Sequence, residues 1–118
     1  MMQIGEVAAR AQVSLPTLRH YDEVGLVRPS ARSEGGFRLY TEADLHRLED
    51  VRCLRFLGLS VEEVGDIIDG IEQCRSATDP HSAATGRRRV NILLTSARER
   101  LERMQDKLDR SRRFLDAH

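Results

Sequence analysis

The feature that most constrains the fold is a long apolar stripe near the C-terminus. From Arg87 to Ala117 the chain contains neither proline nor glycine, and small or apolar residues recur at spacings of alternately four and three. This 3.5-residue period is typical of a coiled-coil seam and predicts a helix over residues 87–118. The stripe consists of Val90, Leu94, Ala97, Leu101, Met104, Leu108, Ser111 and Leu115.

The remainder of the chain is too small to cover this stripe. A helix of about 30 residues is about 45 Å long, and such an apolar stripe would form a large exposed patch if it stayed unpaired. A second copy of the chain is the natural cover, so the sequence predicts a homodimer. The heptads alone do not determine the direction in which the two helices pair.

Two short helices are predicted near the N-terminus. Ile4–Ala11 places its apolar residues on one face at helical spacing. After a turn, Ser14 is a good N-cap for a second helix, and Pro16 falls in its first turn, where a missing N–H costs little. Gly25 is the expected stop of this helix. The pair is typical of a helix-turn-helix.

A basic hairpin is predicted after the second helix. Val27–Pro29 is expected to be a short strand, Ser33–Gly36 a turn, and Phe37–Tyr40 the returning strand. A protein that reads duplex DNA needs one element for the major groove and other groups for the phosphates. Residues 13–40 supply both kinds of group, including Thr17, Arg19, His20, Tyr21, Arg28, Arg32, Arg38 and Tyr40.

A second helix pair is predicted over about residues 42–72. Thr41 to Asp44 and Ser60 to Glu63 resemble capping boxes that open these helices, and Gly58 separates them. Residues 74–86 are rich in Ser, Thr, Ala, Asp and Pro and are expected to be a connector. The predicted plan is mainly α: a DNA-binding domain over 1–73 with a wing at about 27–40, the connector, and a dimerisation helix.

The charge balance restricts how such a protein can bind DNA. Nineteen basic and nineteen acidic residues cancel, whereas a nucleic-acid-binding domain is usually basic. Positive charge is instead local, because the segment from Arg28 to Tyr40 holds three arginines and one acid. DNA binding must therefore depend on where the charges lie.

Other classes of protein are not favoured. No apolar run is long enough for a bilayer, no secretory signal is visible, and the two cysteines do not form a close pair, so we expect a cytoplasmic protein with no membrane partner. The sequence has no phosphate loop, nucleophile elbow or metal motif, which predicts neither an enzyme nor a cofactor. Cys74 and His81 are too few for a closed metal site.

The combined pattern resembles a known family. IGEVAARAQVSLPTLRHYDEVGLVRPSARSEGGFRLYTEADLHRL, with LRFLGLSVEEV further on, is similar to the MerR family of bacterial transcription regulators from Ile4 to about Ile68. The resemblance implies a winged helix-turn-helix and a long helix that pairs antiparallel across a two-fold axis. It also implies a near-palindromic operator in a promoter spacer, which the dimer bends and untwists for RNA polymerase. We expect a short form without a separate effector domain.

The resemblance also implies which residues bind DNA. Two of them depart from the family pattern, because His20 and Phe37 stand where other aromatic residues are usual. Tyr21 and Tyr40 are interpreted equally well as DNA contacts or as core aromatics. With the N-cap Ser14 and the hairpin residue Arg32, the expected DNA-binding set is Ser14, Thr17, Arg19, His20, Tyr21, Arg32, Gly36, Phe37, Arg38, Tyr40 and Arg55.

Three alternatives stay open. RCLRFLGLS around Cys53 resembles the single-cysteine branch of the family, whose members respond to thiol-reactive electrophiles, and Arg52 and Arg55 would favour a thiolate. The interpretation that we favour is that Cys53 is a small buried core residue. The second alternative is a ligand-independent architectural DNA-binding protein or repressor. The third is a coiled-coil adaptor that binds no DNA. No residue identifies an inducer, the regulated genes, or activation as opposed to repression.

Overall fold

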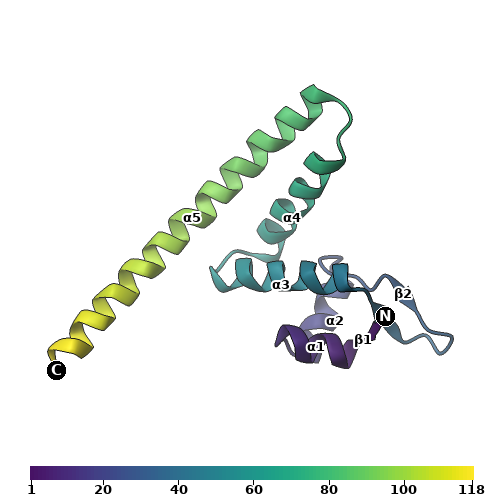
Figure 1. The fold of residues 1–118 in the computed structure, drawn as a ribbon, viewed down its shortest axis with the longest axis horizontal. Coiled ribbons are helices and arrows are strands. Elements are labelled where there is room, and N and C mark those ends of the chain that lie inside the picture. The colour runs from purple at the N-terminus through teal and green to yellow at the C-terminus, as the bar shows by residue number, and fades with distance from the viewer. The chain divides into compact units, whose positions relative to one another are not determined.

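The computed structural model describes all residues from 1 to 118 and contains five helices and three short strands (Figure 1). The chain forms two compact units, Met1–Cys53 and Leu54–His118. No helix combines the length and the apolar composition needed to cross a membrane. The elements are, in order, β1 (Met2–Gln3), α1 (Ile4–Ala11), α2 (Leu15–Glu23), β2 (Ala31–Arg32), β3 (Arg38–Tyr40), α3 (Glu42–Phe56), α4 (Val61–Ser76) and α5 (Pro80–Ala117).

The first unit begins with the predicted helix-turn-helix. α1 has the predicted bounds, and Gln12 closes it in the left-handed conformation with φ 57°. Ser14 caps α2, because its Oγ accepts a hydrogen bond from the Thr17 amide at 3.1 Å, and Pro16 lies in the first turn. Gly25, with φ +76°, follows the end of α2 as expected. The local signals in this region are therefore confirmed.

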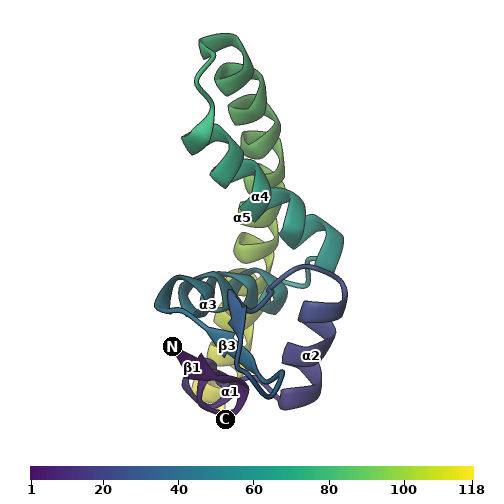
Figure 2. The same cartoon turned by 90° about the vertical axis from the view of Figure 1, so that its right-hand side faces the viewer.

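The wing is a small antiparallel sheet in the order β1-β3-β2 (Figure 2). Our prediction of a strand at Val27–Pro29 is wrong. The amides of Leu26 and Val27 instead donate to the carbonyl oxygen of Tyr21 and close the C-terminus of α2. The first hairpin strand comes later, at β2. The strand β1 was not predicted, because two residues carry no readable alternation.

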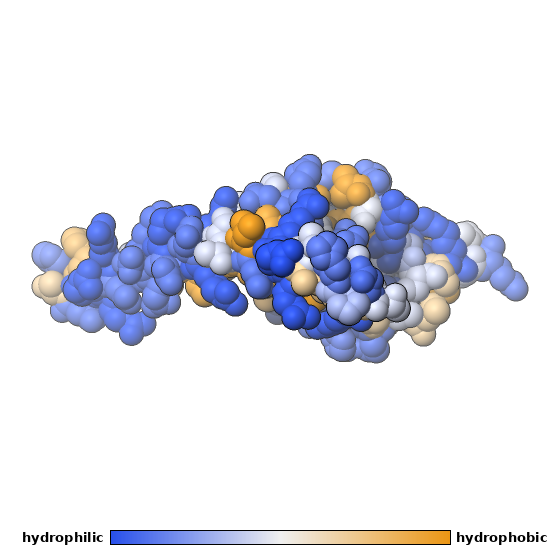
Figure 3. All heavy atoms as spheres, turned by 90° about the horizontal axis from the view of Figure 1, so that it is seen from above, coloured by the Kyte–Doolittle hydropathy of each residue, from blue (hydrophilic) through white to orange (hydrophobic).

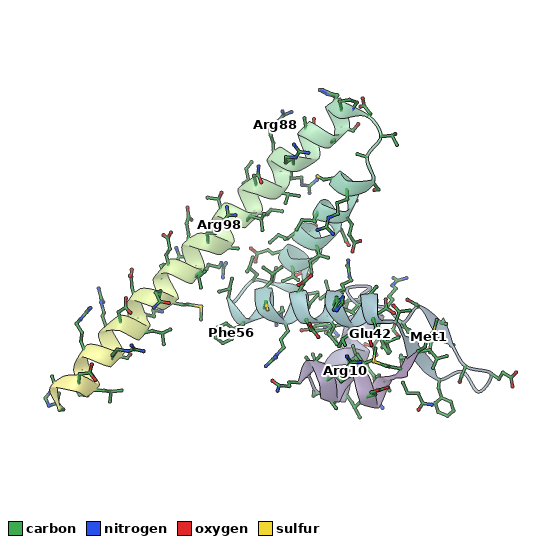
Figure 4. All side chains as sticks on the ribbon, viewed as in Figure 1. Met1, Arg10, Glu42, Phe56, Arg88 and Arg98 are labelled. Carbon is green, nitrogen blue, oxygen red and sulfur yellow. The ribbon has the colours of Figure 1, made fainter.

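Apolar side chains from all the helices of the first unit form its core. Twelve apolar or aromatic residues of this unit are nearly or fully buried: Met2, Val7, Ala8, Ala11, Leu18, Tyr21, Leu26, Val27, Tyr40, Leu45, Leu48 and Val51. Outside this core, the exposed side chain of Arg10 on α1 points toward Glu42 on α3 and forms an ion pair of 2.9 Å (Figure 4). Such exposed pairs contribute little to stability, so the core holds this unit together.

The starts of α3 and α4 follow the predicted capping chemistry. The Thr41 amide donates to Oδ2 of Asp44 at 2.9 Å, and the Asp44 amide donates to Oγ1 of Thr41 at 3.1 Å. Ser60 and Glu63 form the same reciprocal arrangement at α4. In α4, Val64 and the two isoleucines that follow it at helical spacing are buried and form one apolar face of the helix.

In the second unit, α4 and the N-terminal part of α5 run antiparallel and pack against each other, and α5 continues beyond α4 (Figure 1). The predicted connector over 74–86 is wrong, because only residues 77–79 lie outside the two helices. Asp79 caps α5, and Pro80 takes its first position. The small residues of this segment serve close packing: a Cβ placed on Gly86 would lie 3.1 Å from Sγ of Cys74.

The apolar stripe of α5 divides into two parts. Val90 and Ala97 are buried within the chain, so the prediction that they belong to a seam with a second copy is wrong for this structure. Leu101, Leu108 and Leu115 are more than half exposed. Figure 3 shows the end of α5, at the left, as largely hydrophilic on the visible face with a few apolar side chains. Only the C-terminal part of the stripe is therefore available to a partner.

Candidate nucleic-acid interface

The helix α2 presents a polar face to solvent. The helix has nine residues, and its Leu18 side chain lies in the core with no exposed surface. Arg19 and His20 are exposed and Thr17 is half-buried. Ser14 is also exposed, and its Oγ donates to the Thr17 hydroxyl at 2.8 Å. The structure therefore brings these four predicted site residues together on one accessible helix.

The two tyrosines of the predicted set belong to the core. Tyr40 has no exposed surface and Tyr21 is only 7% exposed. Burial raises the pKa of the Tyr40 hydroxyl, and Asp22 raises it further. The expectation that Tyr40 contacts DNA is therefore wrong, and Tyr21 is a core residue rather than a groove contact. The alternation of β3 correctly separated Tyr40 from Leu39, but it could not show which face is buried.

Two wing arginines converge on one carboxylate. Arg32 on β2 and Arg38 on β3 are paired directly across the antiparallel ladder. Nε of Arg38 donates to Oδ2 of Asp22 at 2.7 Å, and Nη2 of Arg32 lies 3.4 Å from the same oxygen. Asp22 is on α2, so this cluster, which we call the Asp22 clasp, joins the wing to the second helix of the helix-turn-helix.

The clasp keeps a net positive charge. Two guanidinium groups share one carboxylate, and the hydrogen bond that Arg38 donates to Asp22 raises the pKa of Arg38 above its ordinary value. An arginine is charged at every physiological pH, so this bond orients the guanidinium group and does not alter its ionisation. The side chain of Arg32 is half exposed, and that of Arg38 is 27% exposed. Both can reach an anion from solvent while they keep their contact with Asp22.

The turn of the wing carries its most exposed aromatic residue. Gly36 has φ +80°, a conformation that favours glycine. Phe37 beside it is 67% exposed, and its amide donates to Oγ of Ser33 at 3.1 Å. Nη1 of Arg32 donates to the Gly36 carbonyl oxygen at 3.3 Å and braces the turn. Gly36 and Phe37 therefore lie where a partner can touch them.

Arg55, a predicted DNA-binding residue, is not part of the first unit, and the sequence did not predict the role of Asp22. Arg55 belongs to the second unit, where its Nη1 donates to the Leu59 carbonyl oxygen at 2.6 Å. Asp22 was not among the predicted site residues. Its role depends on contacts with residues ten and sixteen positions away, and no local signal in the sequence reports such contacts.

The cysteines do not form a metal centre. Cys53 is exposed, so our preferred interpretation of it as a buried core residue is wrong. Cys74 is half-buried, and its thiol lies 4.0 Å from the Ala83 carbonyl oxygen. No group of three or more His, Cys, Asp or Glu side chains is placed to hold a metal ion.

Comparison with known proteins gives a consistent assignment. The family model described as MerR HTH family regulatory protein matches residues 2–71. The HTH-type transcriptional activator TipA of Streptomyces coelicolor is 39% identical over 101 residues, which cover 86% of this chain and 37% of TipA. The HTH-type transcriptional regulator ZntR of Escherichia coli K12 is 33% identical over 117 residues, which cover 99% of this chain and 80% of ZntR.

Solved structures agree with the sequence relatives. A transcriptional regulator of the MerR family from Bacillus cereus superposes with a TM-score of 0.64 at 28% identity, covering 98% of this chain and 75% of that one. The chain spans little more than a third of TipA, so TipA has a large part that this comparison does not reach. All of these similar proteins are transcription regulators and none is an enzyme.

Proposed function

The chain belongs to the MerR family of helix-turn-helix regulatory proteins, and from this membership we propose that it regulates transcription by binding promoter DNA as a homodimer. The operator is a near-palindrome in the promoter spacer. The dimer bends and untwists that spacer so that RNA polymerase can engage both promoter elements. Regulation of this kind acts through the deformability of the DNA as well as its base sequence.

The observation that carries the proposal is that the first unit combines a helix with a solvent-exposed polar face, α2, and a basic wing. Arg19 and His20 are exposed on α2, where base edges and phosphates can be reached. Arg32 and Arg38 lie on the adjoining wing and are tied to the same helix through Asp22. One rigid unit thus offers a groove-reading element and phosphate-binding groups at a fixed spacing.

The second unit supports the homodimer. Leu101, Leu108 and Leu115 follow the heptad spacing and are 52%, 62% and 71% exposed. α5 has 38 residues and is therefore about 57 Å long. A stripe of leucines on so long a helix is covered by pairing with an identical stripe, because a two-fold interface is self-complementary. Two copies related in this way match the two halves of a palindrome.

Deforming the spacer requires free energy from protein contacts. Bending a site of 20–30 base pairs costs on the order of 1–6 kcal/mol. Phosphate contacts on each side of the bend offset that cost, and each salt-sensitive contact releases condensed counterions. Arg32 and Arg38 of the wing are accessible to phosphates outside the groove that α2 enters. Contacts from these residues would stabilise both the complex and the bent form of the DNA.

The test is selection of DNA by the full chain. Random duplexes are enriched by repeated binding, and the affinity of the enriched duplex and of a scrambled duplex is measured by fluorescence anisotropy at several salt concentrations. We expect a near-palindromic consensus, a preference of at least about 10³ over the scrambled duplex, and affinities that fall steeply with salt. Enrichment of no sequence, with no salt-dependent binding, would overturn the proposal and favour the coiled-coil adaptor.

Transcription in vitro then separates regulation from passive binding. The enriched duplex is placed in a promoter spacer, and transcripts are counted with and without the protein. An increase or decrease that depends on spacer length supports control by deformation. A decrease at every spacer length would instead favour a ligand-independent repressor that only occupies the site.

Thiol sensing is the second candidate function, because Cys53 is exposed. A reactive cysteine needs access to solvent, and this one meets that requirement. The test is Cys53→Ala in the transcription assay with an aldehyde as the electrophile. If the protein responds to the aldehyde and Cys53→Ala does not, the sensor is Cys53. A response that survives the substitution, or none in the unaltered protein, rules this function out.

A further inference from the structure

We propose that Asp22 is a positioning residue that sets sequence discrimination by holding the wing arginines at a fixed place relative to α2. The inference rests on the proposed function, because it concerns how this chain distinguishes one duplex from another. Asp22 itself carries the wrong charge to contact phosphate. It acts through Arg32 and Arg38.

The geometry of the clasp is the first support. The short 2.7 Å bond from Nε of Arg38 leaves the two terminal nitrogens of that guanidinium available to another acceptor. Arg32 contacts the same oxygen at a longer 3.4 Å. Asp22 therefore fixes the position of the Arg38 guanidinium through Nε, and the two terminal nitrogens can still donate to a ligand.

The electrostatics of the wing are the second support. Arg32 and Arg38 are directly opposite across the ladder, an arrangement in which like charges are destabilising. The side chain of Asp22 is only 14% exposed, so water screens its attraction to them less than at the open surface. Without that carboxylate the two guanidinium groups would repel and move apart, and the wing would lose its fixed orientation.

A third observation ties the clasp to the core. The Tyr40 side chain is fully buried, its pKa is raised by burial first and by Asp22 next, and Tyr40 is two residues from Arg38 on β3. Because side chains two residues apart lie on the same face of a strand, the buried Tyr40 and the bond from Arg38 to Asp22 anchor the same face of β3. Both anchors fix where Arg38 lies relative to the exposed residues of α2.

Neutralising Asp22 should affect binding to non-specific DNA and binding to the preferred duplex differently. Neutralising Asp22 removes a negative charge near the phosphates, so non-specific binding becomes stronger. It also frees the wing arginines, so the base-reading helix is held less accurately in register and the preferred duplex gains nothing or weakens. The ratio of the two affinities therefore falls. A residue that served only stability would not move that ratio.

The experiment compares Asp22→Asn with Glu23→Gln in the full chain. Glu23 is the next residue, is exposed and carries the same charge, but no hydrogen bond joins it to the wing. Affinities for the enriched and scrambled duplexes are measured by anisotropy at one salt concentration. We expect the preference for the enriched duplex to fall about tenfold in Asp22→Asn and to stay within about twofold in Glu23→Gln. An unchanged preference in Asp22→Asn overturns the proposal.

A second comparison shows whether Asp22 acts through Arg32 and Arg38. In a background that carries both Arg32→Gln and Arg38→Gln, the further change Asp22→Asn should not alter the preference again, since both groups that Asp22 holds are gone. An additional tenfold loss would mean that Asp22 does not work through the wing arginines and would overturn the mechanism. Circular dichroism and thermal unfolding establish that each variant is folded before its affinity is used.

A folding defect does not remove the test. If Asp22→Asn is not folded, Asp22→Glu retains the charge and displaces the carboxylate by one methylene. The preference should still fall, now without stronger non-specific binding, and an unchanged preference would overturn the proposal. Failure of the proposed function has a different signature, because the unaltered protein would then show no preferred duplex at all.

Discussion

Arg38 is a residue through which we expect a protein with no net charge to bind DNA. The chain has 19 basic and 19 acidic residues, so long-range attraction contributes little. Arg38 is oriented by Asp22, and Arg32 lies across the ladder from it. Affinity at this scale depends on a few positioned groups whose removal can be measured one at a time.

Replacing Arg38 with alanine should weaken binding to both the enriched and the scrambled duplex. Loss of the phosphate contact itself affects both duplexes alike. The enriched duplex should lose more, because the wing contact that Asp22 positions no longer helps to fix the register of α2. The slope of log affinity against log salt should decrease by about one unit, as expected for the loss of one phosphate contact. The control is Arg98→Ala, which removes an exposed arginine of α5. An unchanged slope in Arg38→Ala would show that this residue does not touch phosphate.

Replacing Tyr40 with phenylalanine should not reduce stability. The hydroxyl is buried and has no hydrogen-bond partner in the protein, and an unsatisfied buried polar group costs on the order of 1–3 kcal/mol. The free energy of unfolding should therefore stay the same or rise by about 1 kcal/mol, and DNA affinity should be unchanged. Urea unfolding and anisotropy provide the measurements. A loss of more than about 1 kcal/mol would mean that the hydroxyl makes a stabilising contact.

At the scale of the element, hydrogen bonds at the helix starts determine where the helices begin. The side chains of Ser60 and Glu63 each accept a hydrogen bond from the other's backbone amide. At the start of α5, the Asp79 carboxylate accepts from the amides of His81 and Ser82. These bonds favour the ionised carboxylates and lower the pKa of Glu63 and of Asp79. Such caps are readable in sequence, because every group involved lies within three residues.

The cap at Glu63 should make stability depend on pH. Its folded pKa lies below the ordinary 4.5, chiefly because the Ser60 amide donates to the carboxylate. The resulting stabilisation is complete above the ordinary pKa and is lost as the pH falls through the folded value. The melting temperature of Glu63→Gln should therefore fall furthest below that of the unaltered protein at neutral pH, and the gap should close in acid. Glu62→Gln is the control, and a gap independent of pH contradicts the assignment.

Packing between α4 and α5 gives a test with a matched pair of glycines. A Cβ on Gly70 would lie 2.6 Å from Cγ2 of Val90, whereas a Cβ on Gly5 of α1 would meet nothing within 4 Å. Gly5→Ala should stabilise the protein by roughly 0.5–1 kcal/mol through helix propensity. Gly70→Ala should destabilise it, because forced overpacking typically costs about 1–3 kcal/mol. Equal gains in denaturant unfolding at one protein concentration would contradict the close packing.

At the scale of the whole molecule, the homodimer that we propose would pair through the exposed leucines of α5. Leu101→Asp should convert a dimer to a monomer in analytical ultracentrifugation, because a carboxylate at a paired seam would be buried without a partner. Ile92→Asp is the control. Ile92 is 72% exposed, but it lies off the heptad stripe, so the dimer should persist. A Leu101→Asp variant with the mass of the unaltered dimer would exclude this seam.

The sequence by itself determined what local interactions control. Helical periodicity predicted α1, and capping residues such as Ser14 and Ser60 together with glycine stops predicted α2, α3 and α4. The polar face of α2 and the basic character of the wing were also visible, because they follow from side chains within one helix or one hairpin. These features, with the resemblance that they carry, were sufficient to predict the fold class and the class of function.

Only the tertiary structure decided which residues of the site are accessible and which act together. Tyr40 was interpreted equally well as a DNA contact or as a core aromatic, and only the folded structure shows that it is buried. Val90 was predicted to belong to a dimer seam, and only the folded structure shows that α4 packs against it. The Asp22 clasp likewise joins positions ten and sixteen residues apart. Burial and charge pairing of this kind depend on how the chain folds back on itself, and no pattern of neighbouring residues encodes that.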